Sequence, residues 1–156
     1  RTLVPGTAPR ATRSLPAMDD ATIQQLRAEL AEHTMYDLLG AETGLRALVD
    51  RFYDAMDADP AYAPIRSMHQ ADLGSIKQGL FEFLSGWLGA PPLFAQREGG
   101  VCISAAHAAY AIDAEAGDLW VRCIDRAMTD SGIADRYREA LMPALTGMAE
   151  MLRNVD

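Results

Sequence analysis

Apolar residues recur at helical spacing through almost the whole chain from Met18 onward. Steps of three and four residues place Leu45, Leu48, Val49 and Phe52 on one face of a helix. No convincing segment shows the alternation of apolar and polar residues that a half-buried strand requires. A length of 156 residues fits one domain with a substantial core, and no repeat or domain-scale linker divides it. The pattern therefore predicts an all-α fold.

Turn-forming residues divide this pattern into six helical segments. Thr43 is the expected N-cap of a helix that ends before Asp59-Pro60, and Asp113 is the expected N-cap of a later helix. Pro143 is expected to kink the last helix, because proline lacks an N–H and crowds the preceding turn. The expected helices cover 19–32, 43–58, 61–68 (short and turn-like), 73–88, 113–131 and 133–152.

The first 17 residues differ in composition from the rest, with three arginines, three prolines and no acidic residue. A basic, acid-poor lead can mimic a transit peptide, but the prolines oppose an amphipathic helix. We interpret 1–17 as a disordered tail or an expression remnant ahead of a native start at Met18. Residues 18–34 then form an extra N-terminal helix, and the main domain covers 35–156.

Charge and composition narrow the classes of partner. A formal net charge of −8 argues against nucleic acid, because phosphate binding needs a basic face. No apolar run approaches the roughly 20 residues of a membrane helix. Cys102 and Cys123 show no paired framework, which favours a reduced, cytoplasmic protein, although the sequence leaves a disulfide between them open.

His107 is the lone histidine of a short, apolar, alanine-rich segment, Val101–Ile112. Its small neighbours leave room for a large flat group, and a neutral imidazole is the commonest metal ligand among side chains. Tyr53 and Trp120 lie on the inner faces of other expected helices, so their polar atoms could reach the same cavity. Taken separately, these three residues fit ordinary core roles and His69 fits a surface turn. No zinc-type cluster or glycine-rich phosphate loop occurs, whereas a nucleophile–histidine–acid triad is left open without support from spacing.

Taken together, five segments occur in the order and approximate spacing of group II (O-type) truncated haemoglobins. They are Tyr36–Gly40, Arg51–Asp54, Phe83–Pro91, His107 and Asp118–Cys123. The chain resembles that family from about Met35 to Arg153, most specifically around Tyr53, Trp87 and Trp120. The resemblance implies a two-over-two helical sandwich around haem b, with the short helix before the proximal histidine reduced to a loop.

The resemblance also implies roles for individual residues. His107 matches the proximal iron ligand, while Tyr53, Trp120 and His69 match distal residues that face an iron-bound ligand. Apolar or aromatic contacts to the cofactor are expected from Ile76, Leu80, Phe83 and Tyr110. The family usually carries basic residues just before the proximal histidine to bind the haem propionates, but Ser104-Ala105-Ala106 stands there instead. Arg66, Lys77 and Arg97 are the candidate substitutes.

The function implied is reversible binding of O₂, NO, CO or other small ligands, with a redox role such as NO detoxification or peroxidase-like chemistry. Such a role would need a reductase. Two alternatives stay open: a non-catalytic haem-based gas sensor, and a haem-free helical interaction domain. The sequence fixes neither the physiological ligand nor the choice between a monomer and a homodimer.

Overall fold

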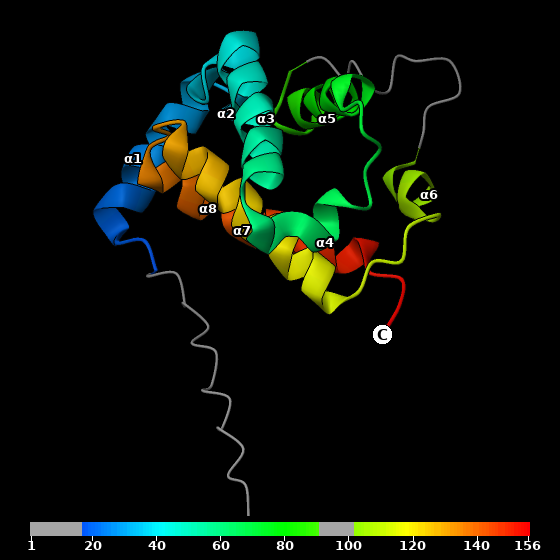
Figure 1. Cartoon of the computed structure of the whole chain (residues 1–156). Coiled ribbons are helices and arrows are strands. Elements are labelled where there is room, and N and C mark those ends of the chain that lie inside the picture. The colour runs from blue at the N-terminus through cyan, green and yellow to red at the C-terminus, as the bar shows by residue number, and fades with distance from the viewer. Residues whose placement is uncertain (1–16, 91–101) are drawn as a thin grey trace, which may run out of the picture.

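The computed structural model describes residues 17–90 and 102–156, and within these ranges the regular structure is entirely helical (Figure 1). The elements are α1 (Asp20–Glu32), α2 (Met35–Leu38), α3 (Ala41–Ala58), the 3₁₀ helix η1 (Pro60–Tyr62), α4 (Ala63–Arg66), α5 (Gly74–Trp87), α6 (Ile103–His107), α7 (Ala114–Asp130) and α8 (Asp135–Leu152). The predicted all-α fold is therefore confirmed. The basic N-terminal lead, apart from Ala17, lies outside the described residues.

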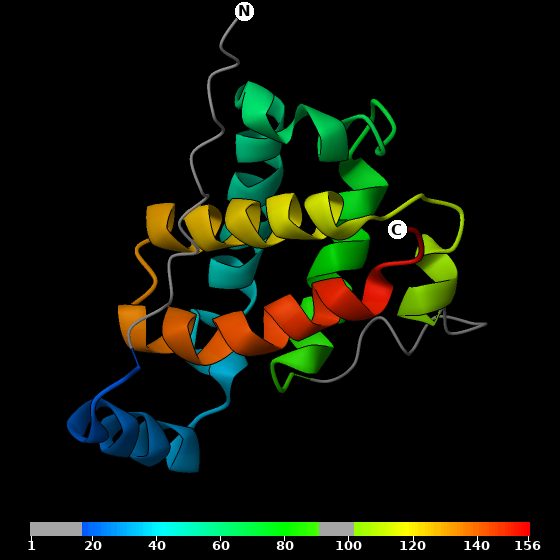
Figure 2. The same ribbon diagram turned by 90° about the horizontal axis from the view of Figure 1, so that it is seen from below.

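Two antiparallel helix pairs form the body of the molecule. Helix α3 packs beside α5, α7 packs beside α8, and the first pair crosses the second through the contact of α3 with α7 (Figure 2). This is the two-over-two arrangement expected from the sequence. Its core is built from the apolar stripes of the helices; the most deeply buried side chains include Phe52, Phe81, Leu45, Met56, Ile124 and Met128.

Capping residues explain several helix boundaries. Asp113 caps α7 as predicted, because its carboxylate accepts a hydrogen bond from the amide of Ala116 at 2.8 Å. The predicted cap at Thr43 is wrong, since α3 begins at Ala41 and Thr43 lies within its first turn. The turn before α3 approaches the helix closely: a Cβ on Gly44 would lie 2.0 Å from the carbonyl oxygen of Leu39. Glycine at position 44 permits that contact.

Two short helices lie at one end of the crossed pairs. Asp59 ends α3 as expected, and its carboxylate accepts a hydrogen bond from Ala61 at the start of η1. The expected turn-like helix is thus split into η1 and α4, and Pro64 lies in the first turn of α4, where its missing N–H costs nothing. The prediction of a loop before the proximal histidine is partly wrong, because Ile103–His107 form the single-turn helix α6.

The N-terminal helix α1 is attached to the start of α8. Glu29 accepts two hydrogen bonds from the guanidinium of Arg136, at 2.8 and 3.0 Å, and both side chains are largely shielded from solvent. The Arg136 interaction lowers the pKa of Glu29 to about 2. Helix α8 then continues through Pro143 to Leu152, although a proline inside a helix removes one backbone hydrogen bond. No helix in the described part of the chain is both long and apolar enough to span a membrane.

Candidate functional site

A cavity of about 300 Å³ lies where α3, α4 and α5 face α6, α7 and α8. Eight of the residues expected to form the site line this cavity. They are Tyr53, His69, Ile76, Leu80, Phe83, His107, Tyr110 and Trp120. These residues come from four helices and two connecting segments, so tertiary folding brings them together. A volume of this size falls within the usual range for small-molecule sites.

His107 lies at the end of α6 and is half-buried against the cavity. Its Nδ1 atom is 2.7 Å from the carbonyl oxygen of Ile103. A carbonyl can only accept a hydrogen bond, so Nδ1 carries the proton and Nε2 keeps its lone pair. That tautomer is the one required for Nε2 to coordinate a metal, with its orientation set by the backbone.

His69 follows α4 on another wall of the same cavity and repeats this arrangement. Its Nδ1 atom lies 2.8 Å from the carbonyl oxygen of Ile65, which again leaves Nε2 as an acceptor. Burial lowers the pKa of His69, and the positive charge of Arg66 lowers it further. The lowered pKa favours the neutral imidazole. The structure places His69 at the cavity and not on an exposed turn.

Tyr53 and Trp120 present two hydrogen-bond donors to the cavity. Tyr53 is only 4% exposed, and burial raises the pKa of its phenol well above the usual range, so the hydroxyl stays protonated. Among the described residues, neither the Tyr53 hydroxyl nor the Trp120 indole N–H belongs to the buried polar atoms that lack a hydrogen-bond partner, so neither group is both sealed from solvent and unpaired. Two donor groups on the wall of one cavity suit a ligand that accepts hydrogen bonds.

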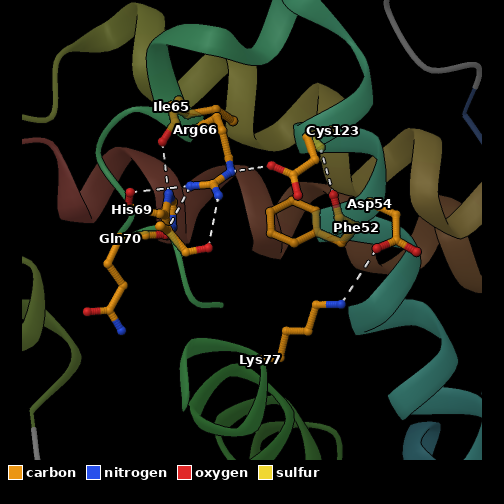
Figure 3. Close-up of polar contacts among 10 residues, drawn as sticks. Phe52, Asp54, Ile65, Arg66, His69, Gln70, Lys77 and Cys123 are labelled. Atoms are coloured by element: carbon orange, nitrogen blue, oxygen red, sulfur yellow. Dashed lines mark hydrogen bonds and ion pairs between the residues drawn. The ribbon is translucent and has the colours of Figure 1, made fainter. Parts of the chain in front are cut away.

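Arg66 and Lys77 do not line the cavity, contrary to their expected role as propionate partners. Arg66 forms an ion pair with Asp57, and its guanidinium donates to the carbonyl oxygens of His69, Gln70 and Ala71 at 3.1–3.4 Å (Figure 3). Lys77 pairs instead with Asp50 at 3.0 Å and Asp54 at 3.6 Å. Arg97, the third candidate, lies outside the described residues. No lysine or arginine occurs among the described residues that line the cavity.

Several further lining residues carry no chemical signature that sequence reasoning could have used. They are apolar or small: Ile65, Met68, Gly79, Leu84, Ile103, Ala106, Ile112, Ala116, Gly117, Met148, Ala149 and Leu152. Gly117 and Ala149 are informative because a Cβ on Gly117 would meet Ala149 only at 3.8–3.9 Å. Small side chains thus keep the space between α7 and α8 open at this end of the cavity.

The residues present fit a haem group. An apolar cavity accommodates a flat macrocycle, His107 offers one Nε2 lone pair, and Tyr53 and Trp120 add hydrogen-bond donors to the same cavity. The described part of the chain has no cluster of three histidine, cysteine, aspartate or glutamate side chains that could hold a bare metal ion. A single imidazole on the wall of an apolar cavity is a donor set with which proteins ligate haem iron.

Comparison with known proteins establishes the family. The chain belongs to the bacterial-like globin family, whose model matches residues 34–154. It is 32% identical to group 2 truncated hemoglobin YjbI of Bacillus subtilis over 119 residues, which are 76% of this chain and 87% of that protein. Membership of a globin family implies haem binding.

Solved structures of related proteins agree with this assignment. The cold-adapted truncated hemoglobin of the Antarctic bacterium Pseudoalteromonas haloplanktis superposes with a TM-score of 0.75 and 35% identity, covering 80% of this chain and all of that one. The truncated oxygen-avid haemoglobin of Bacillus subtilis gives a TM-score of 0.71 and 30% identity, over 78% of this chain and all of that one. The resemblance to group II truncated haemoglobins and the truncated-globin fold are both confirmed.

Proposed function

We propose that this protein binds haem b through His107 and reversibly holds O₂ or another small ligand between Tyr53, Trp120 and His69. Haem supplies an iron atom with one open position for a protein ligand and one for a small molecule. The observation that carries this proposal is that two hydrogen-bond donors, Tyr53 and Trp120, line the same cavity as His107. The family assignment supports it independently.

The two donors favour a ligand that carries partial negative charge. An indole N–H and a protonated phenol both donate, and the neutral His69 offers an acceptor at Nε2. Each good hydrogen bond to such a ligand contributes about 1–3 kcal/mol. Two of them, about 2–6 kcal/mol together, slow ligand release by roughly thirtyfold to about 20,000-fold. A related protein from Bacillus subtilis is described as oxygen-avid, which agrees with slow release.

Slow release of O₂ suits redox chemistry better than bulk oxygen delivery. We therefore propose an NO-detoxifying or peroxidase-like role, in which a cellular reductase supplies electrons. A cytoplasmic setting agrees with two unpaired cysteines, Cys102 on the surface and Cys123 buried in the core. Ile76, Leu80 and Phe83 on α5 provide the apolar wall that limits the access of water to the site.

Turnover assays distinguish this role from gas sensing. Haem-loaded protein is supplied with NO or hydrogen peroxide in the presence of a reductase and its electron donor, and consumption is followed over many equivalents. The expected result is multiple turnovers that fall sharply when Tyr53 is replaced by phenylalanine. Ligand binding without turnover would support a sensor, and a protein that does not bind haem would support a haem-free interaction domain.

A further inference from the structure

The helix that carries His107 has little packing of its own. Helix α6 is five residues long, and none of its side chains is buried. Ser104, Ala105 and Ala106 are exposed to solvent, and Ile103 and His107 are half-buried. A single turn of helix is not stable alone, because nucleation is costly and few backbone hydrogen bonds repay it. Something outside α6 must therefore fix the position of His107.

The segment that follows α8 supplies this attachment through Asn154. The side-chain Oδ1 of Asn154 accepts a hydrogen bond from the amide of Ile112 at 2.9 Å. Its Nδ2 donates to the carbonyl oxygen of Tyr110 at 2.8 Å and makes a longer contact, 3.5 Å, with that of His107. The Ile112 N–H needs an acceptor, and the carbonyl oxygens of Tyr110 and His107 need a donor. Only this orientation of the Asn154 amide therefore satisfies all three contacts.

Backbone hydrogen bonds extend the same junction. The amides of Asn154 and Val155 both donate to the carbonyl oxygen of Ile112, at 2.9 and 3.2 Å. Hydrogen bonds from the main chain and from the Asn154 side chain thus join residues 107–112 to residues 154–155. Tyr110 and Ile112 also line the cavity, so the junction fixes its wall as well as the histidine.

We propose that Asn154 is a positioning residue that holds His107 against the bound cofactor. The inference rests on the proposed function, because it assigns His107 to the iron. Asn154 does not touch the cavity. It acts through the Tyr110 carbonyl and the His107 carbonyl, which lie on either side of the turn that leaves α6. Loss of the Nδ2 donor frees this turn, and His107 then samples more orientations relative to the iron.

Two substitutions distinguish the role of the Oδ1 acceptor of Asn154 from the role of its Nδ2 donor. Asn154→Ala removes both the acceptor and the donor. Asn154→Asp keeps an acceptor for the Ile112 amide but places a carboxylate oxygen beside the carbonyl of Tyr110, so the donor half is lost. Arg153→Ala is the matched control, because the hydrogen bond and the ion pair of its side chain go to Val155 and Asp156 in the same segment. All variants retain the main-chain hydrogen bonds to Ile112.

The test measures two properties of the haem-loaded proteins: the iron–histidine stretching band of the ferrous state, and the rate at which haem transfers to an excess of an acceptor protein. We expect a shifted or broadened band and at least about fivefold faster haem loss for both Asn154 variants, a change typical of losing one or two hydrogen bonds. Exchange of the Ile112 amide hydrogen is expected to quicken in Asn154→Ala and to stay slow in Asn154→Asp. Arg153→Ala is expected to match the parent throughout.

A parent-like band and parent-like haem loss in Asn154→Ala would overturn the inference, and so would equal changes in Arg153→Ala. Failure of the proposed function has a different signature. In that case the parent protein itself shows no iron–histidine band, before any variant is compared, and the positioning role falls with it.

Discussion

The rings of Tyr53 and His69 meet edge to face, with centroids 5.7 Å apart and 78° between their planes. Tyr53 also packs edge to face against Phe52 at 4.9 Å, and Phe52 does the same with Trp120 at 5.7 Å. Phe52 is fully buried, so it fixes the spacing of the two donors on either side of it. The polar side of the cavity is therefore one aromatic cluster drawn from α3, α7 and the segment after α4.

Removing either donor is expected to speed the loss of O₂. Tyr53→Phe and Trp120→Phe keep an aromatic ring while deleting the hydroxyl or the indole N–H, and each is expected to raise the O₂ dissociation rate about tenfold or more. CO is less polarised and responds less. The double variant is expected to be non-additive, because two donors to one ligand are coupled. Stopped-flow rates in both gases provide the measurement, and unchanged O₂ rates in both single variants would exclude this network.

His69 is expected to influence the ferric protein through its neutral Nε2 acceptor. His69→Ala removes an acceptor from the cavity, so the acid–alkaline transition of the ferric haem shifts in pH. A pH titration of the absorption spectrum measures the shift. His33→Ala is a suitable control, because His33 is exposed at the end of α1. If the His69 variant and the parent titrate identically, His69 does not contact the ligand.

Arg66 is expected to hold the His69 segment in place and not to bind a propionate. Arg66→Lys keeps the charge but loses the planar fork that reaches several carbonyl oxygens at once. We expect a loss of about 1–2 kcal/mol in the free energy of unfolding and faster amide exchange in residues 67–72. Urea denaturation measures the change in the free energy of unfolding, and Arg27→Lys, at an exposed position, is the control. Selective loss of haem affinity with unchanged stability would instead point to a propionate contact.

The ion pair between Glu29 and Arg136 predicts a pH-dependent attachment of α1. The pKa of Glu29 is lowered to about 2, so its stabilising contribution is fully present above the usual carboxyl pKa near 4.5 and is lost as the pH falls toward 2. Glu29→Gln is expected to lower the Tm at pH 6 and to flatten its dependence on pH between 4.5 and 2. Glu32→Gln, on the exposed end of α1, is expected to behave like the parent. Identical pH profiles for Glu29→Gln and the parent would contradict the assignment.

Helical periodicity was sufficient to predict the long helices but not their precise starts. The stripe beginning at Leu45 predicted α3, whereas the helix begins at Ala41 after Gly40, ahead of the first apolar residue that periodicity could detect. Helix α6 is too short to show a period. For such elements, tertiary contacts decide the conformation.

Some residues of the candidate site could be predicted from the sequence, and others could not. Residues with distinctive chemistry, such as His107 and Trp120, could be placed at the cavity from their motifs. Small residues such as Gly117 could not, because they contribute space and no reactive group. The partners of Arg66 within the chain could not be predicted, because a cation in a sequence does not reveal which acceptors it will meet. In the fold, the Arg66 guanidinium pairs with Asp57 and donates hydrogen bonds to carbonyl oxygens after α4.

The most direct test of the account is a haem titration of the purified parent protein beside His107→Ala, with His33→Ala as the control. The parent and His33→Ala are expected to give a sharp Soret band at one haem per chain and an iron–histidine stretching band in the ferrous state. In His107→Ala the iron–histidine band is expected to disappear. An unchanged iron–histidine band in His107→Ala would contradict the central claim that His107 is the protein ligand of the haem iron.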